Sequence, residues 1–275
     1  MRNALFLAVL LVGAGLTGLM PQEALAVSVP KNVNISKTQG DEAETTVAVN
    51  RLNPAQLTVI SNIEAGSGIF HAWSKDGGRT WRREIIADGD ALGFACCDAQ
   101  LASDDFGNIF LTYLSSDIFV KMALSTDGGA TFQPLPFLDT LPAGLLPGPW
   151  RSLAAVGQLV GGDQPSISTG AGSVWVSWTS SNGTIQATGA PVTGLGQVGA
   201  FIASQGIPGA NNAGDYGDTS VGPNGQVFVV YQNPTGGQGP SSVYGALDPD
   251  GLGPLGFQPA TLIQKTNVGG FDFIP

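Results

Sequence analysis

The sequence predicts an all-β protein built from one repeated sheet module, and three observations support this prediction. Glycine and proline account for 40 and 18 of the 275 residues, while only 12% of the residues are charged. Short segments of β-branched and aromatic residues recur along the chain after glycine turns. The phrase SKDGGRTW at residues 74–81 returns as STDGGATF at residues 125–132. Such a composition is typical of many short strands joined by tight turns, with little helix.

A separate segment precedes the repeats. Residues 4–20 are apolar apart from glycine and one threonine, they follow a basic start at Arg2, and the segment ends on the small residues Ala24 and Ala26. This pattern predicts a secretory signal peptide over residues 1–26. A membrane anchor is the alternative, but the apolar run is shorter than the roughly 20 residues of a spanning helix. We therefore expect a secreted or periplasmic protein, without a membrane anchor after cleavage, whose mature domain covers residues 27–275.

The repeat defines the expected fold. Strands of closely similar composition are GNIFLTY, GSVWVSW and GQVFVVY, at residues 107–113, 172–178 and 225–231, and QLTVISN at residues 56–62 fills the same place. Each follows a shorter strand that begins near a polar residue. These residues are Glu44, Asp98, Gln164 and Asp218, at intervals of 54, 66 and 54 residues, and a further 54 residues lead to Asp272. The longer interval contains a segment rich in Pro, Leu and Gly, residues 133–162.

A third strand follows in each repeat, and the Asp-Gly-Gly phrase comes directly after it in the first two. Four antiparallel strands recurring every 40–55 residues or so are typical of β-propeller blades. We expect four blades near residues 44–97, 98–163, 164–217 and 218–271, with a fifth beginning at residue 272. Because the sequence ends there, we expect a truncated gene product, a fragment of a longer one, or a chain whose propeller a partner chain completes.

The repeated phrase has the chemistry of a tight turn between the third and fourth strands of a blade. Its glycine pair permits positive φ angles, and its Asp, Ser and Thr side chains can bond the backbone of the turn. The final aromatic ring is expected to pack between sheets. The residues with these structural roles are Ser74, Asp76, Gly77, Gly78, Thr80 and Trp81, and Ser125, Asp127, Gly128, Gly129, Thr131 and Phe132.

The pattern S-x-D-G-G-x-T-[WF] resembles the Asp box, or BNR repeat, of the sialidase superfamily. The resemblance implies a six-bladed propeller of which this sequence covers part. It also implies that Asp76 and Asp127 lie on the face opposite the active site.

A ligand site is expected where the first strands of the blades begin, because these strands line the axis of a propeller. Acidic and amide side chains there could bind sugar hydroxyls, or supply the acid and base of glycosidic cleavage. The ligand-binding candidates are Glu44, Asp98, Asp163, Gln164, Asp218 and Asp272, and the catalytic candidates are Asp98, Asp215, Tyr216 and Asp218. The alternative is that these side chains only cap strand ends. No cofactor or metal site is predicted, although a hard cation such as Ca²⁺ could use the same oxygen ligands.

Two further features bear on the site. Cys96 and Cys97 are adjacent and directly precede Asp98, so they form either a vicinal disulfide or two free thiols. A single histidine, His71, lies within a predicted strand and is expected to be a packed or surface residue.

The resemblance to sialidases is incomplete at the residues that bind substrate. That family binds the substrate carboxylate with three arginines, the first in an Arg-Ile-Pro motif, whereas the corresponding strand here is ETTVAV, with Glu44. The arginines after residue 26 are Arg51, Arg79, Arg82, Arg83 and Arg151. The family's catalytic Tyr and Glu come from later blades, and Tyr216 is the local candidate for this Tyr. We therefore expect no sialidase activity.

The net charge of −10 argues against nucleic-acid binding, because phosphates would not be neutralised. We expect an exported propeller that binds a glycan or another polymer at its axial face. A glycoside hydrolase of the exo-sialidase type, whose remaining catalytic residues follow residue 275, is one alternative. A structural or assembly propeller that binds protein partners is the other.

Overall fold

A computed structural model describes residues 32–63, 68–136, 162–180, 183–210, 217–233 and 242–265. The chain divides into two units, Met1–Asn34 and Ile35–Pro275, and only the second contains described secondary structure. The predicted signal peptide lies outside the described residues. No helix in the described part of the chain is long and apolar enough to cross a bilayer.

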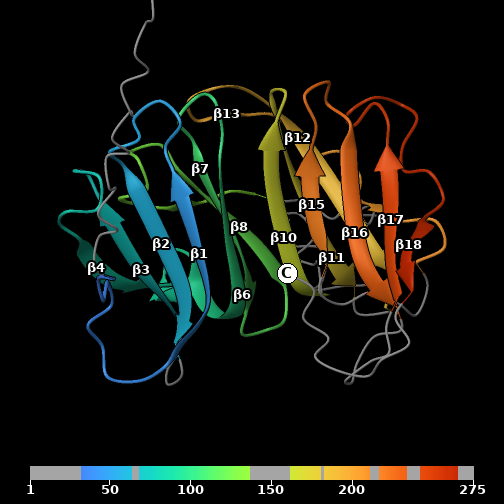
Figure 1. Ribbon diagram of the computed structural model, residues 1–275. Coiled ribbons are helices and arrows are strands. Elements are labelled where there is room, and N and C mark those ends of the chain that lie inside the picture. The colour runs from blue at the N-terminus through green and yellow to red at the C-terminus, as the bar shows by residue number, and fades with distance from the viewer. Residues whose placement is uncertain are drawn as a thin grey trace, which may run out of the picture. The chain divides into compact units, whose positions relative to one another are not determined.

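Ile35–Pro275 contains four antiparallel sheets among its described residues, each formed by consecutive segments of the chain (Figure 1). Sheet 1 contains β1 (Glu42–Val49), β2 (Leu57–Ile63), β3 (Ile69–Ser74) and β4 (Arg82–Ile86). Sheet 2 contains β5 (Asp88–Asp90), β6 (Gly93–Ser103), β7 (Ile109–Ser115), β8 (Val120–Ser125) and β9 (Gln133–Pro134). Sheet 3 contains β10 (Gly162–Gly170), β11 (Ser173–Ser180), β12 (Ile185–Gly194), β13 (Gln197–Val198) and β14 (Gln205–Gly206). Sheet 4 contains β15 (Asp218–Val221), β16 (Val227–Asn233), β17 (Ser242–Asp248) and β18 (Thr261–Lys265).

Strands β2, β7, β11 and β16 lie inside their sheets, and their composition fits this position. All seven residues of β7 are buried, as are most of those in β11, because the sheet is covered on both faces. β-Branched and aromatic residues fit such doubly covered strands. The segments GNIFLTY, GSVWVSW and GQVFVVY therefore form the centres of three sheets, as the repeat predicts.

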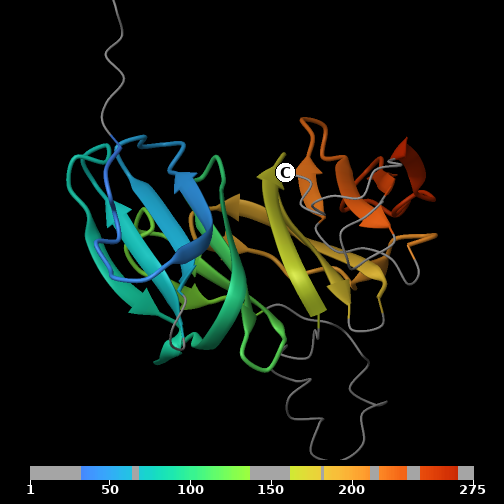
Figure 2. The same ribbon diagram turned by 60° about the horizontal axis from the view of Figure 1, so that its bottom comes forward.

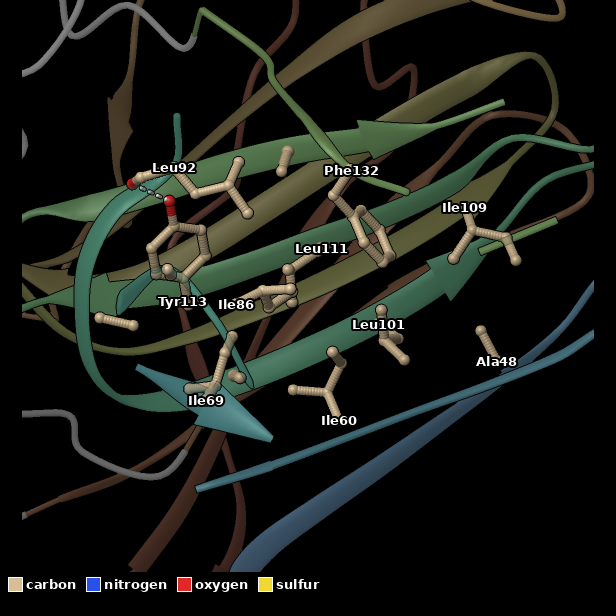
Figure 3. Close-up of a cluster of buried hydrophobic side chains, with 14 residues drawn as sticks. Ala48, Ile60, Ile69, Ile86, Leu92, Leu101, Ile109, Leu111, Tyr113 and Phe132 are labelled. Atoms are coloured by element: carbon tan, nitrogen blue, oxygen red, sulfur yellow. Dashed lines mark hydrogen bonds between the residues drawn. The ribbon is translucent and has the colours of Figure 1, made fainter. Parts of the chain in front are cut away.

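The sheets pack face to face in chain order, with an apolar core at each of three interfaces. Strands β1, β6, β10 and β15 contact one another in that order, so the strands expected to begin the four repeats lie together (Figures 1 and 2). The core between sheets 1 and 2 joins Ile60 and Ile69 to Leu111 and Phe132 (Figure 3). The hydroxyl of Tyr113 in this core donates to the Leu92 carbonyl at 2.7 Å.

Three of the observed sheet starts differ from the expected ones, and the first difference is small, since sheet 1 begins at Glu42 where residue 44 was expected. Sheet 2 begins at Asp88, ahead of the expected residue 98, and sheet 3 begins at Gly162 where residue 164 was expected. The reason is that Asp98 and Gln164 mark irregularities inside β6 and β10, where the pairing register shifts. The adjacent Cys96 and Cys97 therefore lie within β6, in sheet 2.

The two Asp-Gly-Gly phrases connect β3 to β4 and β8 to β9. In the first, Asp76 accepts hydrogen bonds from the backbone N–H and the hydroxyl of Thr80, at 2.9 and 2.7 Å. In the second, Asp127 accepts the same two bonds from Thr131, at 3.0 and 2.9 Å. Both phrases therefore form turns closed by their own side chains.

The register of the strands places these turns at one end of the sheets. Glu42 of β1 lies opposite Ile63 of β2, whereas Ser74 of β3 lies opposite Leu57. The start of β1 and the end of β3 are therefore at opposite ends of sheet 1. We call the end with the Asp-Gly-Gly turns the turn end, and the other, where β1, β6 and β10 begin, the carboxylate end.

Candidate functional site

Three left-handed residues mark equivalent positions in three successive sheets. Glu44, Asp98 and Gln164 have φ angles of 52°, 55° and 48°, values that residues with a side chain rarely adopt. Each lies where its own strand shifts register against the next strand of the sheet. The pairs are β1 with β2, β6 with β7 and β10 with β11. A β-bulge of this kind redirects a side chain, and a left-handed non-glycine residue costs about 1–3 kcal/mol. The same distortion recurs at the carboxylate end of sheets 1, 2 and 3.

The bulges bring carboxyl groups of three sheets together around Asp98. This side chain is buried, with 9% of its surface exposed, and it hydrogen-bonds with the carboxyls of Glu44 and Asp163, which are themselves exposed. We call Glu44, Asp98 and Asp163 the carboxylate cluster. The sequence places all three among the ligand-binding candidates, and the structure brings them together.

Burial and neighbouring charge keep Asp98 protonated at neutral pH. Burial is the main reason that the pKa of Asp98 is raised, to about 8, and the hydrogen bonds and negative charges of Glu44 and Asp163 act in the same direction. A protonated carboxyl has both a donor and an acceptor, whereas a carboxylate only accepts. The proton of Asp98 therefore allows a hydrogen bond between carboxyls that would otherwise repel, and the outer carboxyls keep lone pairs that can accept from a ligand.

Neighbouring groups hold the two outer carboxyls. The side-chain amide of Asn62, near the end of β2, donates to Glu44 Oε2 at 2.5 Å. The backbone N–H of Gln164 donates to Asp163 Oδ1 at 3.0 Å. Asn62 was not among the predicted site residues; its position at the end of a strand paired with the one containing Glu44 was the available signal.

Other predicted site residues have different surroundings. Asp218 is exposed and accepts a hydrogen bond from the hydroxyl of Ser166, in sheet 3, at 2.7 Å. It thus links the first strands of sheets 3 and 4, and Ser166 is a second contact that the sequence pattern did not identify. Asp215, Tyr216 and Asp272 lie outside the described residues.

The two cysteines lie beside the cluster. The Sγ atoms of Cys96 and Cys97 are bonded to each other, in the part of β6 that leads to Asp98. Cys96 is exposed, while Cys97 is half-buried and packs against the core between sheets 2 and 3. The disulfide thus closes a small ring within β6, directly before the bulge, and does not link the strand to another one.

The described residues do not form a metal site, and the histidine lies away from the carboxylate cluster. Within the described ranges, no group of three or more His, Cys, Asp and Glu side chains is arranged to hold a metal ion. His71 is fully buried in β3, with Nδ1 3.1 Å from Glu84 Oε1 and Nε2 donating to the Gly129 carbonyl at 2.8 Å. It is a packed residue at the interface of sheets 1 and 2, where burial lowers its pKa.

The described arginines are all in sheet 1 and its turns, at the turn end. Arg51 follows β1 and pairs with Asp105 at 3.0 Å, Arg79 lies in the first Asp-Gly-Gly turn, and Arg82 and Arg83 begin β4. Arg151 lies outside the described residues. Among the residues that the structure describes, no arginine therefore faces the carboxylate cluster.

No protein-family model matches the chain, and no curated protein matches its sequence. Among solved structures, the chain is similar to a mutant of the α-L-arabinofuranosidase of Fusarium graminearum in complex with an iminosugar inhibitor. The sequence identity is 16%, the match covers 81% of this chain and 66% of that chain, and the TM-score is 0.50. It is also similar to the α-L-arabinanase of Penicillium chrysogenum complexed with arabinobiose, with 14% identity over 79% of this chain and 66% of that chain and a TM-score of 0.50. A third match is the intramolecular trans-sialidase of Ruminococcus gnavus, with 15% identity over 64% of this chain, 36% of that chain and a TM-score of 0.44.

These comparisons establish the fold. The chain is an all-β protein with the β-propeller fold, which confirms the predicted fold class, and it spans just under two thirds of the first two enzymes. The two enzymes with a TM-score of 0.50 are glycoside hydrolases with this fold.

Proposed function

We propose that this protein is an exported, sialidase-like β-propeller that binds a carbohydrate at the carboxylate cluster and has no sialidase activity itself. The observation that carries the proposal is the hydrogen-bonded contact of Asp98 with both Glu44 and Asp163. The three residues come from three different sheets. Three strained bulges at equivalent positions support the same conclusion, because strain that a fold maintains repeatedly is commonly found at functional sites.

The chemistry of the cluster fits sugar hydroxyls. Each hydroxyl can donate a hydrogen bond, and the exposed oxygens of Glu44 and Asp163 can accept it, while the single proton of Asp98 is used within the cluster. The two enzymes with a TM-score of 0.50 are named for arabinose-containing substrates, and one of them is complexed with arabinobiose. Arabinobiose is therefore the first ligand to test.

No arginine among the described residues lies near the cluster, and this supports the part of the proposal that concerns sialic acid. A planar guanidinium binds a carboxylate through two parallel hydrogen bonds, and other side chains do not reproduce this geometry. Each described arginine lies at the turn end, and Glu44 occupies the strand where the resemblance would place the first of them.

Glycoside hydrolysis is the second candidate function, and one observation favours it. A carboxyl with a pKa of about 8 is a proton donor at neutral pH, as a general acid must be. The spacing favours binding instead: the two carboxyls of a glycosidase are about 5–9.5 Å apart, so that a sugar or a water fits between them. Asp98 is within hydrogen-bonding distance of both its neighbours, which leaves no such gap.

The test is calorimetric titration with arabinobiose and a panel of neutral oligosaccharides between pH 6 and pH 9. We expect the affinity of the wild type to fall as the pH rises through about 8, since Asp98 then loses the proton that it donates. Asp98→Asn keeps a donor at every pH and should bind with a flat profile. Asp98→Ala should bind about tenfold more weakly, the cost of an unmatched hydrogen bond. Asp105→Asn, an exposed carboxylate at the turn end, is the matched control.

The outcomes separate the two candidates. Turnover of an aryl arabinofuranoside that Asp98→Asn abolishes while it still binds arabinobiose would show that Asp98 is a general acid, and would establish the hydrolase. Binding without turnover supports the carbohydrate-binding function. The proposal is overturned if no neutral oligosaccharide binds, or if Asp98→Ala binds as tightly as Asp105→Asn.

A further inference from the structure

The turn end has a second concave surface, away from the carboxylate cluster. A cavity of about 570 Å³ opens where the two Asp-Gly-Gly turns approach each other, between sheets 1 and 2. Its walls include Trp73 and Lys75 at the end of β3 and Trp81 and Arg82 at the start of β4. Residues of the second turn complete the lining. A cavity of this size can hold an oligosaccharide of two or three sugar units.

The two tryptophans are held in fixed positions and remain partly exposed. The ring of Trp73 stacks on His71, with the centroids 4.9 Å apart and the planes 20° apart, and His71 is itself fully buried. The indole N–H of Trp81 donates to the Gly78 carbonyl at 2.9 Å. Both rings are half-buried. They therefore present rigid apolar surfaces whose orientation is set before a ligand binds.

Positive charge is concentrated around the cavity. Four of the 11 basic residues of the whole chain lie between residues 75 and 83, although the net charge of the chain is −10. Lys75 and Arg82 line the cavity and Arg79 lies in the adjoining turn, and all three are exposed. Within the described ranges none of these three forms an ion pair with a carboxylate, so their charges are available to a ligand.

The acidic residues of the turns lie next to the cavity lining but do not form part of it. The carboxylates of Asp76 and Asp127 accept hydrogen bonds from their own turns, and neither lines the cavity. The hydroxyls of Thr80 and Thr131 do line it. Their hydrogens are donated to Asp76 and Asp127, at 2.7 and 2.9 Å, and each oxygen therefore offers acceptor capacity to a sugar hydroxyl.

We propose that this cavity is a second binding site, specific for an anionic saccharide with carboxylate or sulfate groups. The tryptophan rings would pack against the apolar faces of the sugar, the threonine oxygens would accept from its hydroxyls, and Lys75 and Arg82 would bind its negative charge. A nucleic acid fits poorly, because the chain as a whole repels a dense polyanion. The site uses none of the residues of the carboxylate cluster, so it does not depend on the function proposed above.

The test compares probes of equal length by calorimetric titration of the full chain. Trigalacturonic acid represents a carboxylated saccharide, galactotriose the neutral counterpart, and triglutamate an acidic peptide. We expect trigalacturonic acid to bind at least about tenfold more tightly than the other two, and added salt to weaken it. The variant with Lys75→Ala and Arg82→Ala should lose about tenfold in affinity. Lys265→Ala, which removes a cation from sheet 4, should retain the wild-type affinity.

Both substituted residues are exposed, so the variant is expected to fold, and its melting temperature checks this. The proposal is overturned if the double variant binds trigalacturonic acid as tightly as the wild type does. It is equally overturned if Lys265→Ala weakens binding to the same extent, which would indicate nonspecific attraction. Equal affinity for triglutamate would show that the site selects charge and not a saccharide, and equal affinity for galactotriose would show that the cations have no role.

Discussion

The first and second Asp-Gly-Gly turns have almost the same sequence and the same internal hydrogen bonds, but their surroundings differ. Ser74 Oγ accepts from the Gly78 N–H at 2.8 Å, and Ser125 Oγ accepts from the Gly129 N–H at 2.9 Å. The ring that ends the second turn, Phe132, is only 7% exposed, within the core between sheets 1 and 2. Trp81, which ends the first turn, is half-buried and belongs to no such core cluster.

The difference shows which part of the motif's structure is determined by its own eight residues and which part depends on a neighbouring sheet. Eight residues suffice to specify the hydrogen-bonded turn, because each donor and acceptor is at most four residues from its partner. Burial of the ring instead requires a sheet ahead of it in the chain. Sheet 1 supplies that surface for Phe132, whereas no sheet precedes sheet 1 among the described residues.

Sheets 3 and 4 show that burial of the ring persists without the motif. Phe201 of sheet 3 is buried in the core that it shares with sheet 2, although its connection has no Asp-Gly-Gly phrase. In sheet 4, Phe257 is 8% exposed and meets Trp175 of sheet 3 edge-on, with the centroids 6.1 Å apart. The aromatic contact with the preceding sheet is thus the more general feature of the fold.

The largest expected effect comes from removing the two aromatic rings. Phe132→Ala should lower the free energy of unfolding by about 3–5 kcal/mol, because it empties a buried site. Trp81→Ala should cost about 1–2 kcal/mol, since its ring is only half-buried. Urea denaturation of the two variants measures both values. Equal losses would contradict the distinction between a local turn and a ring buried by its neighbour.

A substitution at equivalent glycines should give the next largest effect. Gly78 and Gly129 have the same φ of +83°, so alanine has the same backbone cost at both. A Cβ at Gly129 would overlap the side chain of Thr58 in sheet 1, with the Thr58 Cβ only 2.7 Å away, whereas at Gly78 the nearest atom is Leu57 Cδ1 at 3.3 Å. We expect Gly129→Ala to cost about 2–5 kcal/mol and Gly78→Ala about 1–2 kcal/mol.

The same denaturation experiment tests this pair. A cost for Gly129→Ala equal to that for Gly78→Ala would show that the sheets separate easily at this interface. Thr58→Ala removes Oγ1, the atom that would lie nearest the new Cβ, but keeps the Thr58 Cβ, so adding it to Gly129→Ala should restore part of the stability if the overlap is the cause.

Much of the fold could be predicted from the sequence because the repeat is written in short-range patterns. The buried strand that begins near Ile109 and the turn at Asp127 depend on neighbours within a few residues, and both form as expected. The strand boundaries were less predictable. The bulge at Asp98 extends β6 back to Gly93, and no pattern in residues 93–97 indicates this.

The candidate site was predictable only in part. The spacing of the repeats identifies Asp98 and Gln164 as equivalent, and their backbones are equivalent, with φ of 55° and 48°. The side chain that reaches Asp98 from sheet 3 is nevertheless that of Asp163. A difference of one residue in a strand changes the direction of the side chain, and the repeat spacing alone does not resolve it. The raised pKa of Asp98 likewise depends on contacts between sheets, which sequence spacing does not show.

The smallest expected effect, and one that should be alike in the two turns, is the response to acid. Hydrogen bonds from Thr80 and Ser74 lower the pKa of Asp76 to about 2, and in Asp127 burial is outweighed by bonds from Thr131 and Ser125, so its pKa is lowered too. A lowered native pKa stabilises the fold above the ordinary value near 4, and this contribution is lost as the pH falls toward 2. Asp76→Asn and Asp127→Asn should therefore each be less stable than the wild type at pH 5. Each should also lose about 2–4 °C less in melting temperature between pH 4 and pH 2. Asp98 is present in the wild type and in both variants, so its effect on the pH dependence of the melting temperature cancels in the comparison. A melting temperature that falls in a variant as steeply as in the wild type would show that the carboxylate of that turn does not stabilise the fold.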